Sequence, residues 1–156
     1  MRQSLPFDLS KDGTFYDSLG DWMGDVLCDE LPEKGFECRD EQIFMAYQIE
    51  KALKDKKVLF AEAGVGTGKT IAYLLPAVSY ARYTGKPALI ACADETLIDQ
   101  LVKEGGDIHK LRDHLDLKID VRLAKSRDQY LCLKRFEEAE KTETDDWIDD
   151  IAFSIP

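Results

Sequence analysis

The chain has 156 residues, of which 44% are hydrophobic, and it carries a formal net charge of -10. This length is enough for one compact domain with a hydrophobic core. The acidic balance excludes a surface that binds nucleic acid through bulk positive charge, so any such contact must be local. No apolar run approaches the roughly 20 residues that a membrane-spanning helix needs.

The four cysteines are scattered along the chain without C-x-x-C spacing, at positions 28, 38, 92 and 132. The N-terminus shows no basic flank followed by an apolar run, as a secretory signal would. We therefore expect a reduced, cytoplasmic protein with no membrane partner.

The N-terminal segment, residues 1–35, mixes polar and turn-forming residues and has no readable function. The stretch "FYDSLGDWMGDVLCDELPEKG" predicts a short helix that ends at Pro32 and Gly35. Over residues 39–55 the apolar residues recur at helical spacing, with acidic residues at the front and lysines at the back. That pattern predicts an amphipathic helix.

Two short apolar runs, "KVLFAEA" (57–63) and "ALIACA" (88–93), are typical of strands buried in a parallel sheet. The alternating stretch "IDVRLAK" (119–125) predicts a third strand. Further helices are expected over 70–82, over 95–104 and around 108–115. In the first of these, Pro76 introduces a kink or marks a boundary. The order of elements predicts an α/β fold with a parallel sheet, flanking helices and a right-handed crossover.

A phosphate-binding loop is indicated by "AGVGTGKT", which joins the first strand to the following helix. It matches G-x-x-x-x-G-K-[ST] at every fixed position except the first, where Ala replaces Gly. The glycines let successive N–H groups turn toward an anion, and the helix N-terminus adds partial positive charge. Lys69 is expected to reach the β- and γ-phosphates and Thr70 to place its hydroxyl on Mg²⁺, so these two are the expected catalytic residues. The expected nucleotide-binding residues of the loop are Ala63, Gly64, Val65, Gly66, Thr67, Gly68, Lys69 and Thr70.

Three stretches, "GFECRDEQ", "AEAGVGTGKT" and "ALIACADETLIDQL", resemble the start of a DinG-like, XPD-like superfamily 2 ATP-dependent DNA helicase. The resemblance covers residues 36–136 and implies a P-loop NTPase with an incomplete RecA-like lobe over residues 36–131. It also implies ATP and Mg²⁺ as ligands, single-stranded DNA as a partner of the full-length protein, and a role in DNA repair.

In helicases of this kind an R-x-x-Q element reads the adenine edge, and Arg39 and Gln42 stand at its two positions. The resemblance therefore implies nucleotide-binding roles for both. An amide can donate and accept hydrogen bonds at once, which suits N6 and N7 of adenine.

Residues 88–101 resemble the family's motif Ia, a strand and loop that contact the DNA backbone, with Leu97, Gln100 and Leu101 in the following helix. Two other interpretations of this stretch stay open. Asp94 and Glu95 could end a Walker B strand that holds Mg²⁺, or they could form an acidic helix N-cap.

Residues 117–136 form a basic stretch with six basic and two acidic residues, and Tyr130 and Phe136 lie among them. This pattern predicts a phosphate-tracking patch with a base-stacking element.

In the family, a sequence like "SRDQYLC" leads into an inserted domain, and its cysteine is the first of four ligands of a 4Fe-4S cluster. The resemblance thus implies Cys132 as a cluster ligand and residues 132–156 as the start of the insertion. Within it, residues 137–150 hold eight acidic residues and one basic residue and are expected to be solvated.

No cysteine follows Cys132, and no DEAH-type box is present in the sequence. We therefore expect the N-terminal, ATP-binding part of a DNA helicase, which binds ATP in isolation without hydrolysing it. The full-length protein is expected to couple ATP hydrolysis to movement on single-stranded DNA.

Two alternatives to this function stay open. One is another P-loop NTPase, such as a nucleotide kinase or a GTPase-like protein, although no guanine-reading N-K-x-D is present. The other is a non-catalytic nucleotide-binding module.

Overall fold

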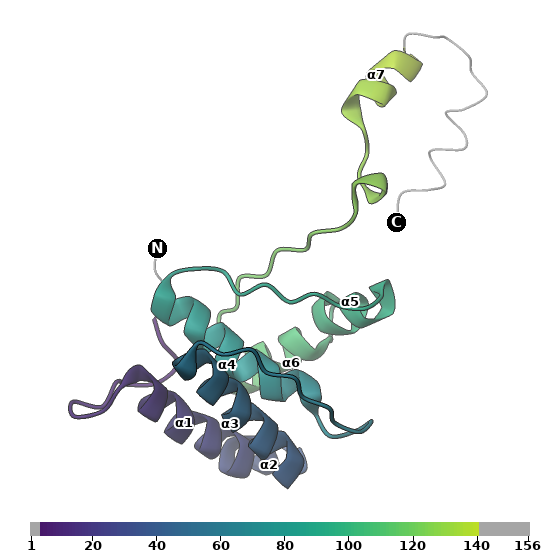
Figure 1. The fold of residues 1–156 in the computed structure, drawn as a ribbon. Coiled ribbons are helices and arrows are strands. Elements are labelled where there is room, and N and C mark those ends of the chain that lie inside the picture. Colours follow the sequence, from purple (N-terminus) through teal and green to yellow (C-terminus); the bar gives the residue numbers. More distant parts are fainter. Residues whose placement is uncertain (1–3, 141–156) are drawn as a thin grey trace. The chain divides into compact units, whose positions relative to one another are not determined.

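The computed structural model describes residues 4–140, and Figure 1 shows their helices. The chain divides into two compact units, one up to Val121 and one from Arg122 onward. Each unit is described by itself below. The domain boundaries that we predict at residues 35 and 131 stay predictions.

The larger unit begins with a continuous helical segment made of α1 (Phe15–Asp25), the π-helix η1 (Val26–Glu30) and α2 (Leu31–Glu33). A capping box starts it, because the Thr14 hydroxyl accepts from the Asp17 N–H at 3.3 Å and the Asp17 carboxylate accepts from the Thr14 N–H at 2.8 Å. The predicted N-terminal helix is therefore confirmed.

The end of this helical segment differs from the prediction at one residue. Pro32 does not terminate the helix, because it lies in the first turn of α2, a position at which helices tolerate proline. The chain turns at Lys34 and Gly35 instead, and Gly35 adopts a φ of +88° that favours glycine.

Two long helices flank the predicted loop, α3 (Asp40–Asp55) and α4 (Lys69–Thr84), and both confirm the helices expected from periodicity. Pro76 lies in the buried interior of α4 and not at a boundary. Gly85, with a φ of +69°, ends α4 as the sequence indicates.

Two shorter helices follow in the larger unit, α5 (Glu95–Val102) and α6 (Asp107–Leu115), close to their predicted positions. The smaller unit contains the 3-10 helix η2 (Arg127–Gln129) and α7 (Leu133–Glu140). In the described part of the chain, no helix combines the length and the apolar character needed to cross a membrane.

The N-terminal helical segment supplies much of the hydrophobic core. Helix α3 packs against both α1 and α4, as Figure 1 shows. The Phe15 ring stacks on Tyr83 of α4 with ring centroids 4.0 Å apart, and the Tyr47 hydroxyl of α3 donates to the Gly20 carbonyl of α1 at 3.0 Å. Seven of the fifteen buried hydrophobic residues of the described range come from this segment: Phe15, Leu19, Trp22, Met23, Val26, Leu27 and Leu31.

The three predicted strands are not formed, since none of residues 4–140 belongs to a β-strand. Residues 57–63, 88–93 and 119–125 run as irregular chain, seen in Figure 1 as long connections between helices. Most of their apolar side chains are exposed, with Val58 at 83%, Phe60 at 94% and Leu89 at 93%, whereas Cys92 and Ile119 are partly buried against the core. The parallel sheet expected from these runs is therefore absent from the described residues, because a strand exists only where a neighbour completes its ladder of hydrogen bonds.

Candidate nucleotide-binding site

The predicted phosphate-binding loop, residues 63–70, enters α4 directly, as its motif requires. Gly66 and Gly68 adopt left-handed backbone conformations with φ of +84° and +74°, and Gly68 is the N-cap of α4. These are conformations that glycine tolerates and most other residues do not. Ala63 has no positive φ, so its position does not demand the glycine of the consensus motif.

The Lys69 ammonium is held on the carbonyl oxygens of its own loop. It donates to Ala63 O at 2.9 Å and to Gly64 O at 2.6 Å, and the Thr67 hydroxyl donates to the same Gly64 oxygen at 3.0 Å. Lys69 is the first residue of α4, where the aligned peptide dipoles place partial positive charge. The loop therefore brings together the Lys69 ammonium, the N-terminus of α4 and two glycines in left-handed conformations.

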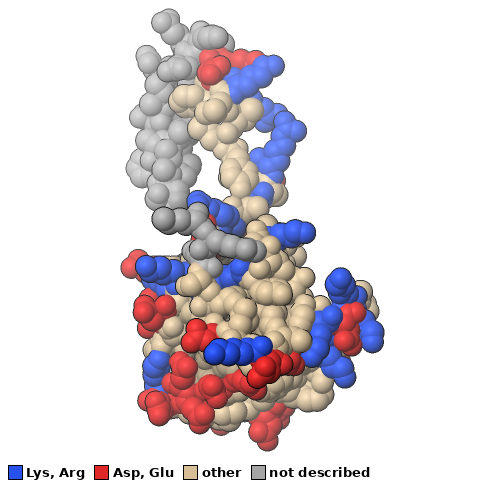
Figure 2. Space-filling model, turned by 90° about the vertical axis from the view of Figure 1, so that its left-hand side faces the viewer, with Lys and Arg blue, Asp and Glu red and all other residues tan. Residues whose placement is uncertain are grey.

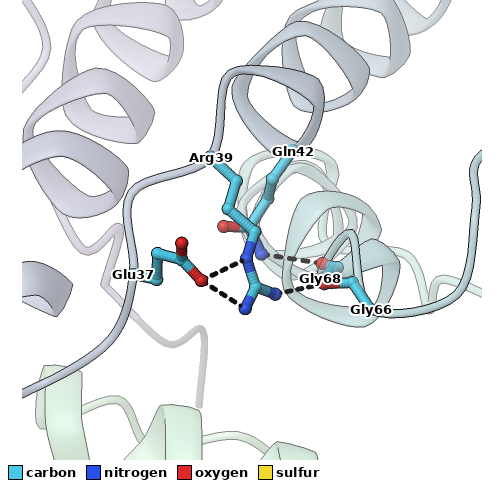
Figure 3. A network of polar contacts seen from close by, with 5 residues as sticks. All are labelled: Glu37, Arg39, Gln42, Gly66 and Gly68. Carbon is cyan, nitrogen blue, oxygen red and sulfur yellow. Dashed lines mark hydrogen bonds and ion pairs between the residues drawn. The ribbon is translucent and has the colours of Figure 1, made fainter.

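The start of α3 contacts the same loop, and Figure 3 shows the network. The Gln42 amide donates to the Gly68 carbonyl at 2.8 Å, and the Arg39 guanidinium donates to the Gly66 carbonyl. Gln42 is buried, with 6% of its surface exposed. The structure thus brings the R-x-x-Q pair and the phosphate-binding loop together, through backbone contacts that the sequence did not predict.

Glu37 is a member of this network to which the sequence analysis gave no role. Its carboxylate accepts from Arg39 Nε at 3.0 Å and from Arg39 Nη2 at 2.7 Å, a two-pronged geometry that orients the guanidinium toward Gly66. Because both side chains are exposed, this ion pair adds little stability, and its effect is orientation. The E-x-R spacing ahead of the helix is the sequence signal that could have indicated this pair.

Two further predicted residues have partners in the larger unit. Burial raises the pKa of the Tyr73 phenol above its usual value, and the side chain of Thr70, the expected Mg²⁺ ligand, offsets part of this rise. The Asp94 carboxylate accepts from the Leu97 N–H at 2.9 Å and so caps α5. This contact supports the helix-cap interpretation of Asp94 over the Walker B interpretation.

A hollow of about 700 Å³ lies beside the loop, between the first half of α3 and residues 59–64. The exposed aromatic residues Phe44 and Phe60 line it, together with the carboxyl side chains of Asp40, Glu41 and Glu62. Phe60 belongs to a run that was expected to pack in a sheet, whereas Phe44 comes from α3.

Acidic and basic side chains are distributed differently over the two units. On the face seen in Figure 2, acidic side chains gather over the lower part of the larger unit, and basic side chains follow the segment that leads to α7 in the smaller one. In this smaller unit the Tyr130 hydroxyl accepts from the Lys125 N–H at 2.9 Å, and a hydrogen bond from Ser126 lowers the Asp128 pKa.

Cys132, the predicted cluster ligand, lies exposed just before α7. Within residues 4–140, no group of three or more histidine, cysteine or acidic side chains gathers where it could hold a metal ion. The described residues therefore supply Cys132 as a single candidate ligand and do not form a cluster site. The remainder of the predicted insertion, residues 141–156, lies outside the described residues.

Residues 45–142 match the DEAD/DEAH box helicase family, and the chain belongs to that family. This confirms the predicted family, whose fold is of the P-loop, RecA-like class. The match includes the phosphate-binding loop and begins after Arg39 and Gln42.

Three relatives are helicases or nucleases by name. The chain is 66% identical over 146 residues to the probable ATP-dependent helicase YpvA of Bacillus subtilis, covering 93% of this chain and 23% of that protein. It is 41% identical over 105 residues to the ATP-dependent DNA helicase YoaA of Haemophilus influenzae, covering 67% of this chain and 16% of that protein. It is 27% identical over 148 residues to the 3'-5' exonuclease DinG of Bacillus subtilis, covering 93% of this chain and 16% of that protein. The chain thus spans less than a quarter of these relatives. No solved structure matches it significantly.

The Gln42 contact generates a prediction about the free chain. Gln42→Ala leaves the Gly68 carbonyl without its side-chain donor, so the free energy of unfolding should fall by about 1 kcal/mol in urea denaturation. The matched control is Gln48→Ala, which removes a half-buried amide from the same helix and should change stability by less than about 0.5 kcal/mol. Equal losses in both variants would contradict a specific contact with the loop.

Proposed function

We propose that this chain is the ATP-binding N-terminal part of an ATP-dependent DNA helicase. The observation that carries the proposal is the loop of residues 63–70, in which left-handed Gly66 and Gly68 place Lys69 at the start of α4. Membership of the DEAD/DEAH box helicase family supports it, as do relatives named as ATP-dependent helicases.

In the proposed mechanism Lys69 exchanges the Ala63 and Gly64 carbonyls for phosphate oxygens of ATP. The exchange is favourable because an ionised acceptor makes a stronger hydrogen bond to an ammonium than a neutral carbonyl does. The loop N–H groups and the N-terminus of α4 stabilise the same negative charge. Thr70 would hold Mg²⁺ through its hydroxyl, and the ion would neutralise charge that develops on the phosphates.

Arg39 and Gln42 have a double role in this proposal. Their contacts with Gly66 and Gly68 fix the conformation of the loop. The Gln42 amide has a further N–H and a carbonyl oxygen, and these hydrogen-bond the edge of the adenine base. The Gln42→Ala variant then has a second readout, because loss of base reading should narrow the preference for ATP over GTP by about 1 to 3 kcal/mol. An unchanged preference would leave Gln42 with its loop contact alone.

Lys69 provides the direct test of nucleotide binding. At about 100-fold excess over Kd, Mg-ATP should stabilise the wild-type chain against thermal unfolding by roughly 2.7 kcal/mol, and Lys69→Ala should lose this gain. Lys51→Ala, which removes an exposed lysine from α3, is the matched control and should keep it. Equal stabilisation of the wild type and Lys69→Ala would refute the assignment of the loop.

The isolated chain is proposed to bind ATP without hydrolysing it, because the 156 residues contain no DEAH-type box to supply the catalytic carboxylates. A phosphate-release assay should therefore stay at background. Hydrolysis by the wild type that disappears in Lys69→Ala would overturn this part of the proposal and favour the alternative of a self-sufficient P-loop NTPase.

We propose single-stranded DNA as the partner of residues 122–136, the part of the basic stretch that lies in the smaller unit. Arg127 and Arg135 are exposed there, and Tyr130, with 55% of its surface exposed, offers a ring for base stacking. Each phosphate contact adds about 0.7 to the slope of log K against log salt for a single strand. Replacing both arginines by alanine should flatten this slope by roughly 1.4 in anisotropy titrations with a labelled oligonucleotide. A slope that matches the wild type would exclude these arginines as phosphate contacts.

We also propose that Cys132 is one ligand of a 4Fe-4S cluster whose other ligands lie in a longer form of the protein. Such a cluster needs about four thiolates at one site. The 156-residue chain should therefore purify colourless, whereas protein expressed from an extended reading frame should be brown, with visible absorbance that Cys132→Ser removes. An extended protein that contains further cysteines but stays colourless, when purified anaerobically with iron and sulfide, would rule out the cluster.

A further inference from the structure

Within the described part of the chain, the backbone between α3 and the phosphate-binding loop has no pairing partner. Residues 57–62 run as irregular chain between the two long helices, as Figure 1 shows. The N–H and C=O groups of residues 58–62 make no hydrogen bond with any other part of residues 4–140. A row of free N–H and C=O groups is a template on which another extended chain can pair.

The side chains of this segment give it one open apolar face. Val58 and Phe60 are 83% and 94% exposed, whereas Leu59 between them is 37% exposed. Successive side chains of an extended chain point to opposite faces, so Val58 and Phe60 share a face when the segment is extended. Adjoining apolar side chains that are left open to this degree mark an interaction surface.

We propose that this segment pairs with the same segment of a second copy of the chain, in an antiparallel arrangement centred on Leu59. A twofold axis requires that residues opposite each other share a face, and a pairing centred on one residue meets this condition. Val58 of each copy then lies opposite Phe60 of the other. Lys56, the exposed residue that follows α3, lies opposite the exposed Glu62. Aromatic side chains opposite β-branched ones, and pairs of opposite charge, stabilise neighbouring strands.

The charges at the two ends of the segment favour a second copy as its partner. Lys56 and Lys57 stand at one end and Glu62 stands at the other. A parallel pairing of two copies would place like charges together, which destabilises a strand pair. The antiparallel pairing brings opposite charges together at both ends. The segment is therefore complementary to itself in charge and in apolar pattern.

The other exposed apolar run, residues 88–93, is less suited to such a pairing. Leu89 is 93% exposed, but Pro87 just before it has no N–H to donate. The Asp94 carboxylate just after the run already caps α5, and Cys92 is partly buried against the core. We therefore place the interface in residues 57–62.

Analytical ultracentrifugation of the 156-residue chain tests the proposal, with dithiothreitol present so that disulfide-linked species do not contribute. As the concentration rises through the micromolar range, the average mass should increase from that of one chain toward twice that value. No nucleotide is added, because the inference does not depend on what the loop binds. A chain that stays monomeric over this range would overturn the proposal.

A pair of apolar variants locates the interface. Phe60→Ser removes the most exposed side chain of the segment and should raise the dissociation constant of the dimer several-fold. Leu89→Ser removes a side chain that is equally open but belongs to the other run, and it should leave the dissociation constant unchanged. Equal effects of the two variants would contradict an interface at residues 57–62.

Charge variants test the register. Lys56→Glu and Glu62→Lys each place like charges opposite one another and should each weaken the dimer several-fold. Glu62→Lys makes the net charge of -10 less negative, so overall repulsion alone would give the opposite result.

Two combinations of these charge variants should restore the dimer: the double variant Lys56→Glu, Glu62→Lys, and an equimolar mixture of the two single variants. Thermal melting by circular dichroism checks that each variant keeps its fold. Single variants that associate as tightly as the wild type, or combinations that fail to recover the dimer while they remain folded, would overturn the pairing centred on Leu59.

Discussion

The left-handed backbone at Gly68 is the constraint on which the nucleotide loop depends. It ends the loop and begins α4, and the Gln42 amide packs against it so closely that any Cβ there would collide with the side chain. A side chain at this position would meet both a backbone penalty and a steric clash. The orientation of the α4 N-terminus toward the loop, and with it the placement of Lys69, therefore depends on one glycine and on the helix that faces it.

The segment with no readable function turns out to support this arrangement. Seven core residues come from residues 15–31, and each buried apolar side chain of this size contributes on the order of 1.5 to 3 kcal/mol. They pack against α3 and α4, the two helices that flank the loop. The loop contacts of Arg39 and Gln42 thus rest on packing that begins far upstream of the motif. Family membership does not reveal this support, because the match begins only at residue 45.

The apolar runs around the loop show why strands are harder to predict than helices. A helix satisfies its own N–H and C=O groups, whereas a strand needs a partner from elsewhere in the chain. Residues 57–63 and 88–93 have the composition of buried strands, yet within residues 4–140 they find no ladder partner, and most of their apolar side chains stay exposed. Phe60 consequently lines a hollow in place of a packed sheet.

The amino-acid sequence by itself determined the loop, the helices and their caps, because each depends on residues within a few positions of one another. Glycine at 66 and 68, the periodicity of α3 and α4, and the acidic cap of α5 are of this kind. Only the tertiary structure decided which groups meet across long separations: Gln42 with Gly68, 26 residues apart, and Arg39 with Gly66, 27 residues apart. Such contacts follow from how the helices pack, and packing depends on buried side chains from the whole unit rather than on any local pattern.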